Sequence, residues 1–142
     1  NKISWVGIDI NPYFVKRAKK LKYNTISGDI NTISELKQSD IVIMIGSLYH
    51  FNSNLSHLFN LVKKASPIFI ISEPIVNLSS RNDLIGFFAR KMAKAGKGNE
   101  EFRFNEHTIN QALIKLQNEI GFSFEIISKK RDILIKISYE RN

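Results

Sequence analysis

Two aspartates follow short apolar segments at positions where each segment ends. Asp9 is the last residue but one of the run Ser4–Ile10, and Asp29 comes after Asn24–Ser27 and Gly28. Such runs are typical of strands buried in a parallel sheet. A carboxylate that follows one strand can accept hydrogen bonds from both hydroxyls of a ribose. A second carboxylate, after the neighbouring strand, can accept a hydrogen bond from an exocyclic amine. The pair predicts an adenosine site, although a helix cap or a turn explains either aspartate alone equally well.

Polar residues also follow two later apolar segments. The segment Ile41–Ile45 ends at Gly46-Ser47, and Ile68–Ile71 is stopped by Ser72-Glu73-Pro74. Ligands of an open parallel sheet bind beyond the carboxyl ends of its strands, so these residues join the candidate site. Glu73 is open to two interpretations, a contact with the substrate or a cap for the next segment.

Histidine supplies the second kind of candidate chemistry. His50 comes soon after Ile41–Ile45 and directly after Tyr49. Because its pKa lies near neutrality, it could take a proton from a hydroxyl nucleophile; local packing is the competing interpretation. His57 and His107 are expected on the surface. With no cysteine and scattered histidines, the chain shows no metal-ligand spacing.

Strand and helix patterns alternate along the chain. Helices are predicted after Asn11-Pro12, over Leu55–Val62, near Ile85–Met92, and from Asn105 to Gly121. The segments Phe122–Ser128 and Ile133–Tyr139 are joined by four charged residues, which indicates an antiparallel hairpin. We therefore predict an α/β fold: a doubly wound, mostly parallel sheet with helices on both faces and a C-terminal antiparallel hairpin.

Length and composition limit the class of protein. The 142 residues fit one domain, and 43% apolar residues suffice for a core. No apolar run approaches the roughly 20 residues that span a bilayer, so we expect a soluble, cytoplasmic chain without an integral membrane segment. The net charge of +8 favours anionic partners, or reflects a lysine-rich surface. The oligomeric state is left open.

The motifs in this order resemble the class I S-adenosylmethionine-dependent methyltransferases. Val6–Pro12 is similar to that family's second strand and following helix start, and Ser27–Ile30 to its Gly-Asp after the third strand. The resemblance implies that Asp9 binds the ribose of the cofactor. It also implies that Asp29 and Ile30 frame the adenine.

Later segments extend the resemblance over nearly the whole chain. Asp40–Phe51 is similar to the family's fourth strand and the loop facing the methyl donor, and the closing hairpin is similar to its end. The implied cofactor contacts are Asp9, Ile10, Gly28, Asp29, Ile30, Gly46 and Ser47. The resemblance places Tyr49 and Glu73 on the substrate side and His50 at the methyl-transfer site.

One family motif is missing. The Gly-x-Gly-x-Gly loop of the family's first strand does not occur before Asp9, and Gly96-Lys97-Gly98 comes far too late. The chain starts at Asn1 rather than Met, and a strand pattern follows at once. We expect that an N-terminal segment precedes residues 1–142, which then form one N-terminally truncated domain with its first strand missing.

The resemblance implies an enzyme that moves a methyl group from S-adenosylmethionine to a small-molecule acceptor, leaving S-adenosylhomocysteine. Residues 75–104 are interpreted as an insertion that forms an acceptor pocket or lid, with Arg90, Lys91 and Lys94 on one helix face; an ordinary amphipathic helix is the alternative. Two other functions stay open. One is a methyltransferase acting on RNA or other nucleic acid, suggested by the charge. The other is a non-catalytic scaffold.

Overall fold

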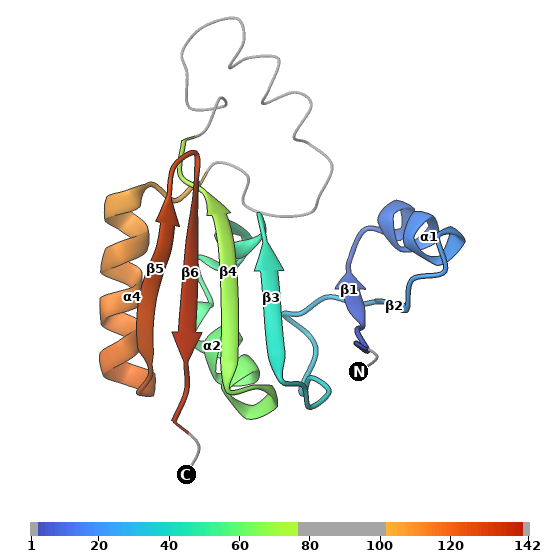
Figure 1. Ribbon diagram of the computed structural model, residues 1–142, viewed down its shortest axis with the longest axis horizontal. Coiled ribbons are helices and arrows are strands. Elements are labelled where there is room, and N and C mark those ends of the chain that lie inside the picture. The colour runs from blue at the N-terminus through green and yellow to red at the C-terminus, as the bar shows by residue number, and fades with distance from the viewer. Residues whose placement is uncertain (1–2, 77–101, 141–142) are drawn as a thin grey trace, which may run out of the picture. The chain divides into compact units, whose positions relative to one another are not determined.

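The computed structural model describes residues 3–76 and 102–140. Contacts divide the chain into two compact units, residues 1–34 and 35–142 (Figure 1). The predicted helix near Ile85–Met92 and most of the segment 75–104 lie outside the described residues. The interpretation of that segment as a lid therefore stays a prediction.

The first unit is a strand, a helix and a strand. β1 (Gly7–Asp9) and β2 (Thr25–Ser27) pair in parallel, with Asp9 opposite Ser27. α1 (Pro12–Lys20) starts as predicted, because the Asn11 side chain accepts the Tyr13 amide over 2.9 Å. Asn11 thereby satisfies an amide that the first turn of the helix leaves without an intrahelical partner.

The inner face of α1 is narrower than its sequence indicates. The apolar spacing of Phe14, Val15, Ala18 and Leu21 predicts a broad buried stripe. Only Val15 is buried, whereas Phe14 is 51% and Leu21 59% exposed. This part of the prediction is wrong because two strands of three residues each offer little surface to cover.

The second unit contains a four-stranded sheet in the order β3-β4-β6-β5. Its strands are β3 (Ile41–Ile45), β4 (Ile68–Pro74), β5 (Ser123–Lys129) and β6 (Asp132–Ser138). β3 runs parallel to β4, and β6 runs antiparallel to both of its neighbours. The C-terminal hairpin is thus confirmed.

β4 is longer than predicted. The sequence places its end at Ser72-Glu73-Pro74, but Glu73 pairs with Ile133 and Pro74 with Asp132 of β6. The antiparallel partner therefore extends the strand through residues whose types suggest a stop. As a result, Glu73 belongs to the sheet rather than to the loop beyond it.

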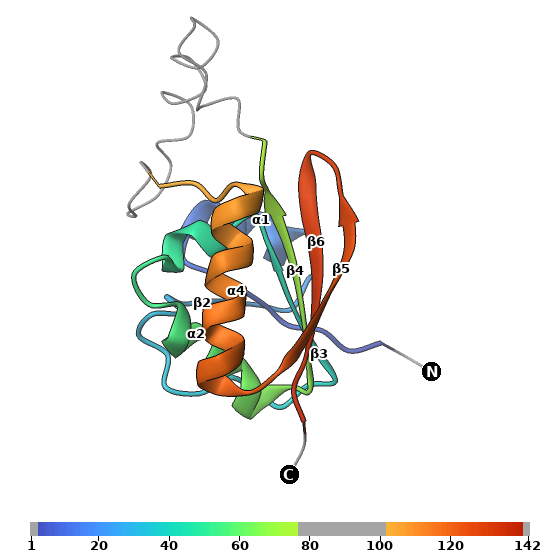
Figure 2. The ribbon, with the colours of Figure 1, turned by 90° about the vertical axis from the view of Figure 1, so that its left-hand side faces the viewer.

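Two helices of the second unit pack on one face of this sheet (Figure 2). They are α2 (Leu55–Ala65) and α4 (Glu106–Ile120), and α4 is bounded by an Asn105–Thr108 capping box and by Gly121, as predicted. Alternate residues of β4 and β6 face these helices and form the core: Phe69, Ile71, Glu73, Ile133, Ile135 and Ile137. The α/β class is confirmed, and α2 and α4, the described helices of the second unit, supply one of the two predicted layers.

A short 3-10 turn, which the sequence did not indicate, follows β3. This turn, η1 (Leu48–Phe51), buries Leu48 and Phe51 and exposes parts of the two residues between them. Among the described residues, no helix is long and apolar enough to cross a bilayer.

Candidate functional site

Asp9 stands exposed at the carboxyl end of β1. Its Oδ1 accepts the Asn11 amide over 2.7 Å, which fixes the side chain at the entry to α1. Its Oδ2 makes no hydrogen bond to any residue described. The neighbouring Ile10 is 53% exposed. Asp9 thus has the turn role that was one interpretation of the sequence. Its second carboxylate oxygen is available to accept a hydrogen bond from a ligand.

Gly28, Asp29 and Ile30 lie at the same end of this sheet. The Gly28 amide donates to the Asp9 carbonyl over 3.1 Å, so the two strand ends are adjacent. Asp29 Oδ1 accepts the Asn31 amide over 2.9 Å, and both Asp29 and Ile30 are half-buried. The structure brings the two predicted aspartates to the same edge of the β1–β2 sheet. Each carboxylate accepts a hydrogen bond from the backbone amide two residues later in the chain.

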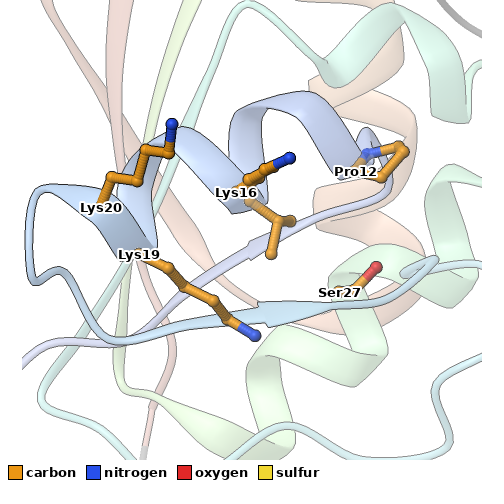
Figure 3. A pocket seen from close by; sticks show the side chains of 6 residues that line it. Pro12, Lys16, Lys19, Lys20 and Ser27 are labelled. Atoms are coloured by element: carbon orange, nitrogen blue, oxygen red, sulfur yellow. The ribbon is translucent and has the colours of Figure 1, made fainter.

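An open hollow of about 500 Å³ lies in the same unit, between α1 and β2. Figure 3 shows Lys16, Lys19 and Lys20 projecting from the helix and Ser27 on the strand. Pro12 and Val15 complete the lining, which contains no carboxylate.

Gly46 and Ser47 turn the chain at the end of β3. Gly46 has a φ of 59° and donates its amide to the Ser72 carbonyl over 2.7 Å. Ser47 Oγ donates to the Ile45 carbonyl over 3.0 Å, and the Ser47 carbonyl accepts the His50 amide over 3.2 Å. A left-handed φ favours glycine, so the residue type at 46 follows from the turn.

Glu73 is buried, with 1% of its surface exposed. Its Oε2 accepts the Leu48 amide over 3.0 Å, while Oε1 is buried without a hydrogen-bond partner. Burial raises the pKa of this carboxyl from 4.5 to about 7. The Leu48 and Tyr49 amides and the Arg103 charge act against that rise, and Asp132 adds to it.

Tyr49 and His50 are half-buried on η1, with ring centroids 3.8 Å apart. The guanidinium carbon of Arg103 lies 3.4 Å from the centroid of the Tyr49 ring, a cation–π contact. Arg103 was missed in the sequence. The one sequence feature that could have indicated it is its position between two aromatic residues, Phe102 and Phe104. In the structure, the rings of these two residues pack edge to face just before α4.

The remaining histidines bear out the prediction only in part. His107 is exposed, as expected, but His57 is half-buried on α2 and its Nε2 has no hydrogen-bond partner. Among the described residues, no group of three or more histidine, aspartate or glutamate side chains could hold a metal ion.

The predicted residues thus fall into two sets. Asp9, Ile10, Gly28, Asp29 and Ile30 belong to the first unit. Gly46, Ser47, Tyr49, His50 and Glu73 belong to the second unit. Within each unit, they gather where parallel strands end.

Solved structures similar to this chain are methyltransferases. A small RNA methyltransferase matches 95% of the chain at 18% identity and a TM-score of 0.65. Magnesium protoporphyrin IX methyltransferase from Synechocystis, solved with S-adenosylhomocysteine, matches 95% at 16% identity and 0.59. The plantazolicin methyltransferase BamL, also with S-adenosylhomocysteine, matches 99% at 15% identity and 0.68.

The chain has the fold of these methyltransferases. It spans 20%, 64% and 69% of the three neighbours' own lengths. No family model and no curated protein matches the sequence. At these identities, the likeness establishes the fold, and the chemistry has to be argued from the residues.

Proposed function

We propose that this chain binds S-adenosylmethionine and transfers its methyl group to a small-molecule acceptor. The observation that carries the proposal is the hydrogen bond from the Gly28 amide to the Asp9 carbonyl, which sets Asp9 and Asp29 on adjacent strand ends. The fold shared with methyltransferases solved with S-adenosylhomocysteine supports the same cofactor.

In this proposal, the first unit holds the adenosine half of the cofactor. Asp9 accepts from the ribose hydroxyls through Oδ2, since Oδ1 is engaged by the Asn11 amide. Asp29 accepts from the exocyclic amine of the adenine, and the Ile30 amide lies beside the ring. Because both carboxylates are already oriented by local bonds, little side-chain entropy is lost on binding.

The second unit supplies the reactive end. Cofactor chemistry provides an electrophilic methyl on a sulfonium, and the chain's task is to align a nucleophile with it. As the sequence resemblance implies, Gly46 and Ser47 are proposed to contact the cofactor and Tyr49 to contact the acceptor. His50 takes the acceptor's proton where the nucleophile is a hydroxyl.

A small acceptor is the first candidate, because the sequence resemblance implies one; Tyr49, His50 and Arg103 are half-buried and are the side chains proposed to face it. A nucleic-acid acceptor is the second candidate, because Lys16, Lys19 and Lys20 line a hollow without carboxylates. RNA binding would weaken steeply with salt, as phosphate contacts do, and replacing these lysines would flatten that dependence.

The first experiment is calorimetric titration with S-adenosylhomocysteine, using the complete product of the gene. We expect binding by the wild-type protein and its loss in Asp9→Ala. Asp40→Ala is the matched control, since Asp40 is another exposed aspartate, in front of β3. If the folded wild-type protein does not bind, the enzyme proposal fails and a scaffold is the better interpretation.

A further inference from the structure

We propose that Glu73 is a positioning residue that clamps η1 to the end of β4 and thereby presents Tyr49 and His50 to the reacting groups. This inference rests on the proposed function for its consequence in catalysis, but not for the clamp itself. It differs from the expectation that Glu73 touches the substrate.

The clamp joins two places far apart in the sequence. Glu73 Oε2 accepts the Leu48 amide over 3.0 Å, across 25 positions of the chain. Both side chains are 1% exposed, so water does not compete for this bond. The carboxylate therefore connects the last part of β4 directly to the first residue of the turn after β3.

Without Glu73, the Leu48 amide has no replacement partner in the described structure. Ser47 stands at the usual capping position, but its side chain makes no cap bond and donates to the Ile45 carbonyl instead. A buried amide left without a partner is unfavourable, so loss of the carboxyl group should displace this four-residue turn. The turn thus depends on the carboxyl group that β4 supplies.

The charges around Glu73 make the clamp sensitive to protonation. Arg103, which precedes α4, favours the carboxylate, and Asp132, at the start of β6, disfavours it. A carboxylate accepts a backbone hydrogen bond more strongly than a neutral carboxyl does. Burial outweighs this preference and raises the pKa of Glu73 to about 7, so the closed turn is expected to loosen as the pH rises towards 7.

Amide hydrogen exchange measured by NMR tests the clamp without any ligand. In Glu73→Ala, the Leu48 amide should exchange at least about tenfold faster, whereas Glu73→Gln, which keeps an acceptor oxygen, should stay close to wild type. Glu125→Ala is the matched control, because Glu125 is an exposed glutamate on β5. Unchanged exchange at Leu48 in Glu73→Ala would overturn the proposal.

A pH series covers the case in which Glu73→Ala does not fold. In wild type, the protection of the Leu48 amide, corrected for intrinsic exchange, should decrease between about pH 5 and 7, because opening exposes the carboxyl to water. In Glu73→Gln, it should be flat. Equal profiles in the two proteins would show that the carboxyl group does not control the turn, and would overturn the clamp.

The catalytic consequence is read separately. S-Adenosylhomocysteine should shift the Tyr49 and His50 backbone resonances in wild type and in Glu73→Gln, and should shift them at most half as far in Glu73→Ala. Equal shifts in all three proteins would refute the positioning role. Absence of binding by wild type would instead refute the proposed function and leave the exchange result standing.

Discussion

The Gly28 amide donates a hydrogen bond to the Asp9 carbonyl over 3.1 Å, and this bond ties the end of β2 to the end of β1. In consequence, the carboxylate that ends β1 and the one that follows β2 share an edge. Each is also held by an amide two residues further on. Such local bonds orient a carboxylate before a ligand arrives, so the predictions begin with this pair.

Asp29 is expected to recognise the exocyclic amine of the adenine. Wild-type protein should prefer S-adenosylhomocysteine over its deaminated counterpart, S-inosylhomocysteine, which lacks that amine. Asp29→Asn keeps an oxygen for the Asn31 amide but loses the charge. It should reduce the ratio of the dissociation constants of S-inosylhomocysteine and S-adenosylhomocysteine by roughly fivefold to tenfold. Paired calorimetric titrations measure the ratio, with Asp40→Asn as the control. A ratio that Asp29→Asn leaves unchanged would remove Asp29 from the adenine site.

Gly46 is expected to be required for its backbone conformation alone. Its φ is 59°, and a Cβ added there would meet nothing within 4 Å. Gly46→Ala should lower the free energy of unfolding by about 1 kcal/mol, because an L side chain disfavours the left-handed region. Gly46→Asn should cost less, since asparagine tolerates that region better. Urea unfolding measures both, and equal stability of Gly46→Ala and wild type would contradict the prediction.

Arg103 and Tyr49 should show an energetic coupling. The guanidinium carbon lies 3.4 Å from the ring centroid, and such partly buried cation–π pairs contribute about 0.5–2 kcal/mol. A double-mutant cycle with Arg103→Met and Tyr49→Leu isolates this energy from urea unfolding. Arg131 is an exposed arginine in the β5–β6 turn. The same cycle with Arg131→Met in place of Arg103→Met should give no coupling energy. Equal coupling in both cycles would refute the contact.

Glu73 should make stability depend on pH. Burial raises its folded-state pKa to about 7 from 4.5, so between these values the folded chain binds more protons than the unfolded chain. The free energy of unfolding should therefore fall as the pH rises from about 4.5 to 7, by at most about 3 kcal/mol.

Glu73→Gln should remove that contribution, because glutamine does not titrate. Thermal or urea unfolding at a series of pH values measures it, and Glu125→Gln, an exposed position on β5, should retain the wild-type slope. A slope as steep in Glu73→Gln as in wild type would assign the pH dependence to other groups.

The sequence alone determined the features that depend on residues close together in the chain. Asn11-Pro12 begins α1, Asn105 caps α4 and Gly121 ends it, because capping and the left-handed turn involve amides and carbonyls within a few positions. The closing hairpin was predictable for the same reason. So was the position of Asp9 and Asp29 at strand ends, since apolar runs and the polar residues after them are local signals.

Only the tertiary structure decided what distant segments do to one another. β4 continues through Glu73 because β6 pairs with it, and that pairing buries a carboxyl group which the sequence placed in a loop. The Leu48 amide meets Glu73, and Arg103 lies over Tyr49, through contacts between separate elements. No local pattern encodes these contacts, because their free energy comes from burial and charge in a core that exists only once the chain has folded.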